Sequence, residues 1–599
     1  MALSSLRRSD AFRDGKWLLW ASGAIMIAIL ASKIVELFDG TLASLDDMAR
    51  LQQVRDLIGG QAWFVVDQSR LLTPEGGEMH WSRLPDLFMA GFIVIMQPLI
   101  GQSAAEALAV GIWPLTLLSA ALILLCTIMQ RLEINIAGQL IAFLFFIGSA
   151  AVYNFWPGRI DHHGFVALLL LGGLAALLSK QQTARSGIIL AFCVCASLTI
   201  AIEGLPYIVG LIAAAGLFWL VRGHREGVRL ASMGLALMAF STFFLIFDAP
   251  GWGPRRMVCD AYGWSHWAAL LSGGGLLALL GIFGGWLETW QKRTLAAVIA
   301  GGITLAIFVA ANPACLGDPY ADVPETVRQS WLSAVAEAQS LPALLGEENN
   351  RVIWVFGFLV TTSLATIWMI LNASPEQRLP CISVALLLAL GIATTIWQIR
   401  GQSFSHLFGL FGAAWLSGVM FSKWQKQRGV VPLLMFAGAT LLLTPTAWRS
   451  FGYSLYPASA NHEDADTLSA DCILPENYRH LASGPLKRVH TPIDLGMPIL
   501  ARTPHSVFVG PYHRNVLGIE RANSVLIGDP DDAQQKLLDM GATHLAYCRR
   551  LGETERYERI WPNSFAAQLN ANEFPDWLEP ADDLTETDGV IRLYRVKSK

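Results

Sequence analysis

Long apolar segments alternate with short polar ones along most of the chain. After a first apolar segment at 17–38, twelve more follow, at 107–129, 135–153, 164–180, 186–202, 204–221, 229–248, 266–286, 294–311, 352–372, 380–397, 404–421 and 430–446. A helix that crosses a bilayer needs about 20 consecutive, mostly apolar residues. The pattern therefore predicts a polytopic α-helical membrane protein with about thirteen transmembrane helices.

One further apolar segment, 87–100, is short and contains Pro98. If it does not cross the membrane, the basic residues that follow the later segments lie on the same side as the basic N-terminus. This is the positive-inside distribution, and a crossing at 87–100 would reverse it. We therefore predict a membrane-embedded helix within a first outer loop, 39–106, and a cytoplasmic N-terminus. The segment 17–38 is long for a signal peptide and lacks a small-residue cleavage site, which favours a signal anchor.

The composition changes after residue 447, where polar residues and turn formers replace the apolar segments. HSVFVG at 505–510, THLAYC at 543–548 and IRLYRV at 591–596 read as strands, and DPDDAQQKLLDMGA at 529–542 reads as a helix. We predict a membrane domain at 1–446, with a long outer loop at 312–351, and a soluble α/β domain at 447–599 on the outer face.

Composition and cysteine content narrow the class of protein. Hydrophobic residues make up 53% of the chain and charged residues 15%, which is typical of polytopic membrane proteins. The formal net charge of -4 gives no sign of a nucleic-acid partner. Four of the eight cysteines fall in predicted outer regions. They could form the disulfides Cys259–Cys315 and Cys472–Cys548, or remain four buried thiols.

The first outer loop begins with two adjacent carboxylates, Asp46 and Asp47, and Arg55 follows Asp46 by nine residues. A polar loop with paired acids at the end of its anchoring span is where a membrane enzyme would place its chemistry. The alternative is structural, because Ser44, Asp46 and Asp47 are all good helix N-cap residues.

Further candidates lie at the outer ends of later spans. Asp161, His162 and His163 are consecutive, and could bind a divalent metal, act as a base, or cap the following helix. Glu203 interrupts an apolar pair of spans, where a carboxylate costs roughly 2.5–3.5 kcal/mol and is usually paired or functional, unless it lies in a hydrated turn. Arg400 suits a phosphate in the headgroup region or a snorkelling anchor.

Two outer loops carry weaker signals. The loop 249–265 contains Arg255, Arg256 and Asp260 among tryptophans, and could bind phosphate or sugar or form an interfacial belt. The loop 312–351 contains Glu337 in an amphipathic stretch. A long ordered loop between spans is often a lid or a binding loop.

In the order of these parts, the chain resembles the GT-C glycosyltransferases, and most of all the catalytic subunit of oligosaccharyltransferases. In that family, an Asp precedes an Arg by nine residues in the first external loop and a D…P-x-G…W/Y-P run follows. The matching residues here are Asp46, Arg55, Asp67, Pro74, Gly76, Trp81 and Pro85. The acid pair of the second external loop matches 161–163, the S-V-x-E motif of the fifth matches 334–337, and the arginine that meets the lipid-linked phosphate matches Arg400.

Two departures qualify the resemblance. His163 stands where the family has a second acid, which implies a weaker or altered metal site. The WWDYG motif that reads the acceptor sequon is absent, which argues against glycosylation of asparagine in proteins. Tyr512, His513 and Arg514 lie in a comparable place, and could read another acceptor or be ordinary turn residues.

The resemblance implies inverting transfer of a sugar from a polyprenyl-phosphate donor to a glycan or lipid-linked acceptor at the external face. Asp46, Asp47 and Asp161 are the candidate catalytic residues. A divalent cation, Mg²⁺ or Mn²⁺, would be held by Asp46, Asp161, His163 and Glu337. The donor phosphate would meet Arg55, His162, Glu203 and Arg400. The acceptor would meet His80, Trp81, Tyr512, His513 and Arg514.

Two other functions stay open at this point. The first is an oligosaccharyltransferase that acts on protein through a divergent acceptor site. The second is a flippase or transporter of lipid-linked saccharides, although transporters place charges near the midplane and often show repeated halves. We expect a membrane lipid environment, a bacterial inner membrane with the C-terminal domain in the periplasm, and no nucleic-acid partner.

Overall fold

The computed structural model describes a few positions between 24 and 32 and then the residues 37–42, 44–181, 183–248, 258–318, 320–321, 323–346, 349–457, 471–548, 551–581 and 590–598. Most of the expected signal anchor at 17–38 lies outside these residues, as do Arg255 and Arg256 of the loop 249–265.

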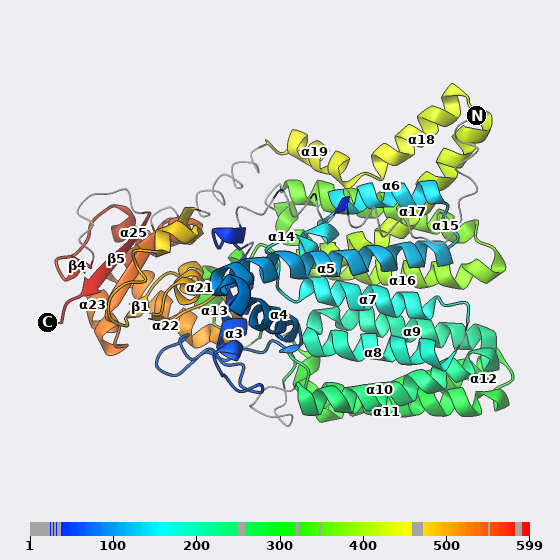
Figure 1. Ribbon diagram of the computed structural model, residues 1–599, viewed down its shortest axis with the longest axis horizontal. Helices are drawn as coiled ribbons and strands as arrows, with labels where there is room; N and C mark the ends of the chain where they lie inside the picture. The colour runs from blue at the N-terminus through cyan, green and yellow to red at the C-terminus, as the bar shows by residue number, and fades with distance from the viewer. Residues whose placement is uncertain are drawn as a thin grey trace.

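Apolar helices lie side by side in a bundle that forms the larger part of the molecule (Figure 1). They are α5 (Gln102–Arg131), α6 (Ile136–Gly148), α7 (His163–Leu177), α8 (Ala184–Ile200), α9 (Leu205–Arg222), α10 (Gly227–Phe247), α11 (Trp264–Phe283), α12 (Trp290–Ala311), α15 (Gly357–Leu371), α16 (Pro375–Trp397), α17 (Gln402–Gln427) and α18 (Val430–Leu442). Each of the twelve later apolar segments of the sequence coincides with one of these helices.

Length and composition identify the membrane-spanning candidates among the described residues. Seven helical stretches are long and apolar enough to cross a membrane. An eighth is possible if α18 and α19 (Pro445–Leu455), which meet at a 68° bend, form one broken span. Several predicted spans are shorter helices, such as α6, α7 and α8, because they end at turns after 13 to 17 residues. The fold fits a polytopic helical membrane protein, and the count of thirteen spans stays a prediction.

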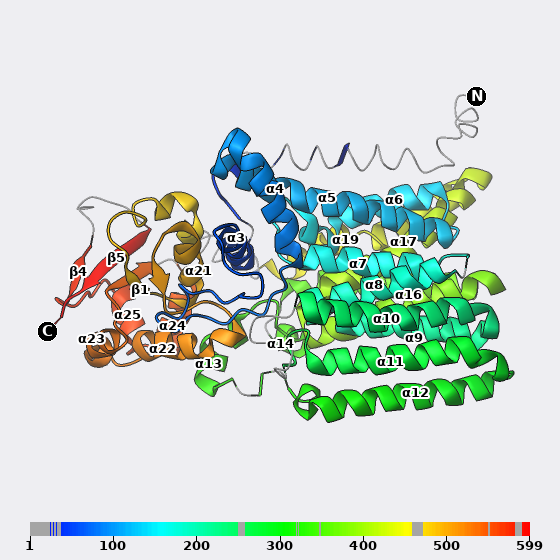
Figure 2. The same ribbon diagram turned by 60° about the horizontal axis from the view of Figure 1, so that its bottom comes forward.

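The first outer segment forms two helices at the end of the bundle. Ser44 caps α3 (Leu45–Ile58) by accepting a hydrogen bond from the backbone N–H of Asp47. Pro85 lies in the first turn of α4 (Leu84–Ile100), a position that proline tolerates because its missing N–H would have no helical partner there. Figure 2 shows α3 between the bundle and the C-terminal part, with α4 beside it. The expected helix at 87–100 is present, and its embedding without crossing stays a prediction.

The C-terminal part is built on a five-stranded sheet with the order β2-β1-β3-β5-β4. The strands are β1 (Arg488–His490), β2 (Ser506–Val507), β3 (His544–Cys548), β4 (Leu578–Pro580) and β5 (Ile591–Val596). β1 pairs in parallel with β2 and β3, and β5 is antiparallel to β3 and β4. The accompanying helices are α21 (Ile493–Arg502), α22 (Val516–Leu526), α23 (Pro530–Asp539), α24 (Gly552–Ile560) and α25 (Phe565–Asn570).

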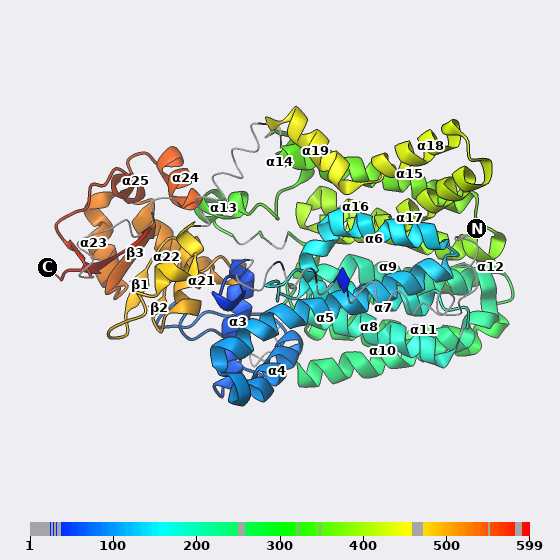
Figure 3. The same cartoon turned by 45° about the horizontal axis from the view of Figure 1, so that its top comes forward.

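The first outer segment and the C-terminal part share a hydrophobic core. Ala49, Leu71 and Trp81 pack in one cluster with Leu495 and Tyr512. The backbone continues this contact: the N–H of Thr73 donates to the carbonyl of Val507, and the N–H of Val507 donates to Arg70. Figure 3 shows the two parts meeting at α3. The predicted domain boundary at 447 stays a prediction, since this core contains residues from both sides of it.

Both cysteine pairs expected from the sequence are disulfides. Cys259–Cys315 joins the segment before α11 to the segment after α12, and Cys472–Cys548 joins the start of the C-terminal part to β3. The other four cysteines, Cys126, Cys193, Cys195 and Cys381, are buried free thiols within helices.

A close backbone approach at Gly496 generates the first testable prediction. A Cβ atom at Gly496 in α21 would lie 1.8 Å from the carbonyl oxygen of Val509, which precedes the segment that carries Tyr512. We expect Gly496→Ala to lower the free energy of unfolding by about 1–3 kcal/mol or more, because backbone must move to admit the methyl group. Gly216→Ala in α9, where nothing lies within 4 Å of the added atom, is the matched control. Unfolding in detergent would measure both, and equal stability of the two variants would contradict this packing.

Candidate active site

Asp47 is a fully buried anchor at the first turn of α3. One carboxylate oxygen accepts the backbone N–H groups of Ile160 at 2.7 Å and Asp161 at 2.9 Å. The other accepts the hydroxyl of Ser44 at 2.8 Å and the guanidinium of Arg159 at 3.1 Å. Both oxygens are therefore occupied, and Asp47 ties α3 to the segment between α6 and α7 that contains Ile160 and Asp161.

From Arg159, charged groups alternate in sign across the loops at the same end of the bundle. Arg159 pairs with Asp161, whose carboxylate lies 3.0 Å from Nδ1 of His163. Nε2 of His163 lies 2.9 Å from Glu203 in the turn Ile202–Gly204, which joins α8 to α9. Although burial opposes ionisation, Arg159 and His163 hold the pKa of Asp161 well below its usual range.

Arg400 continues this alternation from the turn Ile399–Gly401, which joins α16 to α17. Its Nη1 lies 2.6 Å from Glu203 and its Nη2 lies 3.1 Å from Glu337. Backbone bonds hold the segment of Glu337 in place, since its carbonyl accepts the N–H of Arg400 and the carbonyl of Gln339 accepts the N–H of Ile399. The segment that carries Glu337 and Gln339 is therefore hydrogen-bonded to the turn that carries Arg400.

Asp46 is the carboxylate that this network surrounds, and within the described part of the chain it forms none of these ion pairs. Burial and the nearby carboxylates of Glu337 and Asp161 raise its pKa to about 7. Tyr512 approaches Asp46 from the C-terminal part, and burial together with the Asp46 carboxylate raises the pKa of this phenol. Asp46 is thus a carboxylate that can take up or release a proton near neutral pH.

Aromatic rings line the same region. The ring of His162 stacks on His163 at 4.4 Å, and Nε2 of His162 lies 4.0 Å from Glu203. Trp81 lies 6.1 Å from His162 on one side and 5.6 Å from Tyr512 on the other. Arg50 lies over the face of Trp81 at 4.7 Å. These contacts join the second outer loop to the C-terminal part through Trp81.

The donor atoms fit a divalent cation. His162, His163 and Glu203 each offer one ligand atom within 4.8 Å of the others, and Nδ1 of His162 is buried without a hydrogen-bond partner among the described residues. Asp161 adds a carboxylate oxygen 3.0 Å from His163, and Asp46 lies near enough to Asp161 for their charges to interact. Such a mixture of oxygen and imidazole ligands suits Mg²⁺, Mn²⁺ or Zn²⁺.

The predicted acceptor residues lie together at the junction with the C-terminal part. His80 lies 4.9 Å from His513, ring centre to ring centre, and 6.4 Å from Trp81. His513 and Arg514 both bind Asp260, at 2.7 Å in each case. Burial lowers the pKa of His80 to about 3, so its imidazole is neutral.

Arg55 lies apart from the charged network. Its guanidinium binds both oxygens of Glu106, at 3.1 and 2.7 Å, and donates to the carbonyl of Ala501 at 2.7 Å. These contacts link α3 to α5 and α21. The predicted role of Arg55 at the donor phosphate stays a prediction.

Sequence reasoning assigned no role to Arg159, and it did not identify Asp260 as the partner of His513 and Arg514. The position of Arg159 two residues before Asp161 was a usable signal, because a buried acid requires a nearby cation. Asp260 gave no such signal, since its partners lie more than 250 residues away in the sequence.

Arg159 generates the second testable prediction. We expect Arg159→Met to lower the free energy of unfolding by about 3–5 kcal/mol, because Asp47 and Asp161 would remain buried without their cation. The matched control is Arg521→Met, which breaks an exposed pair with Glu75 and should cost about 1 kcal/mol or less. Unfolding of the purified protein in detergent would measure both. A loss at Arg159 no larger than at Arg521 would contradict the structural role given to this guanidinium.

No protein-family model matches the chain, and no curated protein is similar to it in sequence. Solved structures do resemble it. The archaeal oligosaccharyltransferase AglB from Archaeoglobus fulgidus, in complex with an inhibitory peptide and a dolichol-phosphate, superposes with a TM-score of 0.65 and 13% identity over 92% of this chain and 72% of that one. An Archaeoglobus fulgidus oligosaccharyltransferase in complex with Zn and sulfate gives a TM-score of 0.61 and 15% identity, over 90% and 69% of the two chains.

These likenesses extend over nearly the whole chain. At such low identity they establish the fold and not the activity. The structure therefore confirms, at the level of the fold, the resemblance to oligosaccharyltransferases of the GT-C class that the sequence indicates.

Proposed function

We propose that this chain is an integral membrane glycosyltransferase that takes a sugar from a polyprenyl-phosphate donor. The observation that carries the proposal is the environment of Asp46. Among the described residues, its carboxylate takes part in none of the ion pairs that surround it, and it lies at the end of the bundle next to the C-terminal part. The likeness to AglB, whose structure contains a dolichol-phosphate, supports the lipid-linked donor. Transfer takes place at the external face of a bacterial inner membrane. The N-terminus lies in the cytoplasm, thirteen helices span the membrane, and the domain 447–599 lies in the periplasm.

Arg400 is our candidate for holding the donor phosphate. It lies where α16 and α17 meet, at the end of two membrane-spanning candidates, so that a lipid-linked phosphate can reach it from the bilayer. Its present partners, Glu203 and Glu337, are respectively one quarter and one half exposed. An arriving phosphate would compete with these carboxylates for the guanidinium. His162, whose Nε2 lies 4.0 Å from Glu203, would add a further contact to the phosphate.

The cation site would be formed by Asp161 and His163, with Glu337 or Glu203 completing it, and Asp46 would stay outside the metal's ligands so that it can act as the base. A bound Mg²⁺ or Mn²⁺ would stabilise charge on the departing phosphate as a Lewis acid. His163 bridges Asp161 and Glu203 in the present arrangement, so a bound cation would take the place of one of these two contacts of the imidazole.

Asp46 would act as the base in a single inverting displacement. An acceptor hydroxyl gives its proton to the carboxylate, and its oxygen forms the new bond to the anomeric carbon. The bond from that carbon to the phosphate oxygen breaks, and its electron pair leaves with the phosphate. Because its pKa is about 7, Asp46 can hold a proton taken from the acceptor and release it to water near neutral pH.

The acceptor would enter between the first outer segment and the C-terminal part. Tyr512 lies near Asp46 and packs edge-on against Trp81, with His80, His513 and Arg514 adjoining. Both rings are buried here, so an acceptor would have to open this contact. Aromatic rings with a few polar groups suit a saccharide, so we favour a glycan or a lipid-linked acceptor. The missing sequon motif also favours this choice over protein.

An oligosaccharyltransferase acting on protein is the second candidate. It is favoured by the fold, since the structures that this chain resembles include an Archaeoglobus fulgidus enzyme tethered to an acceptor peptide with the NVT sequon. Glycopeptides that depend on this chain would identify it. A lipid-linked saccharide flippase has no comparable observation in its favour.

The third testable prediction concerns Asp46. We expect Asp46→Asn to lower the rate of sugar transfer by about 10²–10⁴-fold, because the amide cannot accept the proton. The measurement is the release of polyprenyl phosphate from lipid-linked sugar in membranes that contain the chain. Asp532→Asn, on the exposed face of α23, is the matched control. A folded Asp46→Asn protein with undiminished transfer would refute the proposed base.

The pH dependence gives the fourth prediction. Asp46 must be ionised to act as a base, and its pKa is about 7. The transfer rate should therefore fall tenfold for each pH unit well below about 7 and level off above it. A transfer assay from pH 5 to 9 would measure this profile. A rate that is flat from pH 5 to 7 would contradict it, because a carboxyl with an ordinary pKa would already be ionised there.

A further inference from the structure

Two imidazoles and a carboxylate meet at a second place, at the junction of three chain segments. His80 lies in the segment between α3 and α4, and Asp260 lies in the segment before α11. His513 begins the short turn His513–Asn515 in the C-terminal part. More than 170 residues separate each of them from the next along the chain, so only the fold brings them together.

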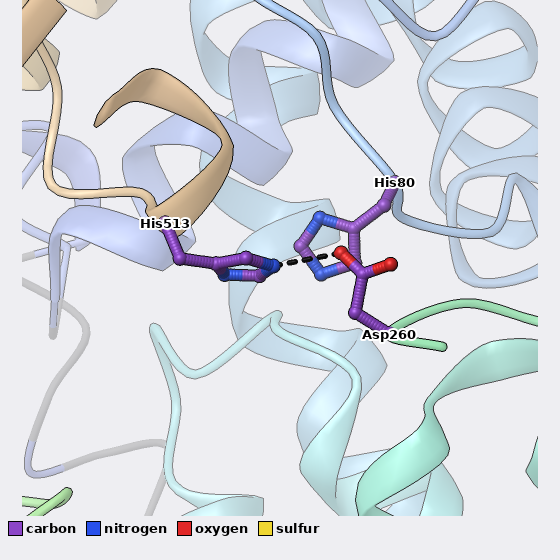
Figure 4. Close-up of side chains that lie close together, drawn as sticks. All are labelled: His80, Asp260 and His513. Carbon is purple, nitrogen blue, oxygen red and sulfur yellow. Dashed lines mark hydrogen bonds and ion pairs between the residues drawn. The ribbon is translucent and has the colours of Figure 1, made fainter. Parts of the chain in front are cut away.

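The three side chains converge on one point (Figure 4). One nitrogen of each imidazole and one oxygen of Asp260 lie within 4.8 Å of one another, and Nε2 of His513 is 2.7 Å from the carboxylate. A zinc ion lies about 2.0–2.2 Å from each of its nitrogen and oxygen ligands.

The surroundings complete the case for a cation. Arg514 donates to both oxygens of Asp260, at 2.7 and 2.8 Å, and lies 3.3 Å from Glu78. Asp260 and Glu78 thus both contact this one guanidinium, beside the two imidazoles. In metal sites an outer hydrogen-bond partner commonly fixes the orientation of a ligating carboxylate. Arg514 fits that position. It donates to Oδ1 of Asp260 through Nη2 and to Oδ2 through Nε, and His513 also contacts Oδ2.

We propose that His80, Asp260 and His513 form a binding site for a transition-metal ion of the Zn²⁺ class. Imidazole nitrogen with one carboxylate favours such ions over Mg²⁺ and Ca²⁺, which prefer oxygen ligands. Three protein ligands leave one tetrahedral position for water. The site is separate from the group of Asp161, His163 and Glu203, with which it shares no residue.

The metal would fasten the C-terminal part to the membrane part. Asp260 follows Cys259, whose disulfide to Cys315 ties its segment to the end of α12. His80 precedes Trp81, and His513 follows Tyr512, the two aromatic residues placed beside Asp46. A metal bound to both histidines would therefore hold those aromatic rings at a fixed spacing.

The fifth testable prediction is tight zinc binding by the full chain in detergent. The protein is stripped with a chelator, loaded with zinc chloride, dialysed and measured for zinc by mass spectrometry. We expect His80→Gln and His513→Gln to lower the zinc affinity of this site by more than about tenfold. Replacing zinc with cobalt should give the wild type a four-coordinate visible absorption band that both variants lack.

Two controls carry the same substitution. His224→Gln removes an exposed imidazole at the far end of α9, and His163→Gln disrupts the other imidazole group. Both should keep the tight zinc ion. Two results would overturn the site: a loss of zinc in the His163→Gln protein alone, and a wild-type protein that retains no zinc after dialysis. If His80→Gln or His513→Gln misfolds, a second measurement tests the site: the thermal stability of the His163→Gln protein with and without zinc. Zinc should still stabilise this variant, because its proposed zinc ligands are intact. No stabilisation by zinc would also overturn the site.

Discussion

The need to pair buried charge organises this protein. Arg159, Asp47 and Asp161 are nearly inaccessible to solvent, and an isolated charge in such a place would cost several kcal/mol. Alternation of sign from Asp47 through Arg159 to Glu337 meets that cost, and it also links five separate segments of the chain. The loops at this end of the bundle are therefore held by the same groups that make the candidate site polar.

Within this network, two adjacent carboxylates have different environments. Asp47 accepts four hydrogen bonds and is fully buried, so it is suited to support. Asp46 points toward Glu337 and Tyr512 and keeps a pKa near neutrality. The division arises because the backbone N–H groups of Ile160 and Asp161 reach only one of the two side chains. Under the proposed function, Asp47 therefore supports the loop and Asp46 stays available as the base.

Several residues selected from the sequence lie together in the structure. Apolar periodicity predicted the helices, and the order of the polar residues between them placed Asp161, Glu203, Glu337 and Arg400 at one end, where the structure brings them together. Sequence reasoning could not separate the roles of Asp46 and Asp47, since both are equally good capping residues and only tertiary contacts distinguish them. It assigned Arg55 to the donor phosphate, a role that stays a prediction, and it did not anticipate the contacts of this guanidinium with Glu106 and Ala501, which lie far away in the sequence. Long-range pairings of this kind depend on packing, which no local pattern encodes.

The most direct test of the transferase assignment is a mass-spectrometric comparison of surface glycans and lipid-linked sugars from cells with and without this chain. The proposed function predicts that cells without it lose one sugar addition and accumulate the corresponding polyprenyl-phosphate sugar on the outer face of the membrane. Unchanged glycans, or a lipid-linked precursor trapped on the inner face, would contradict a transferase, and the second result would identify a flippase.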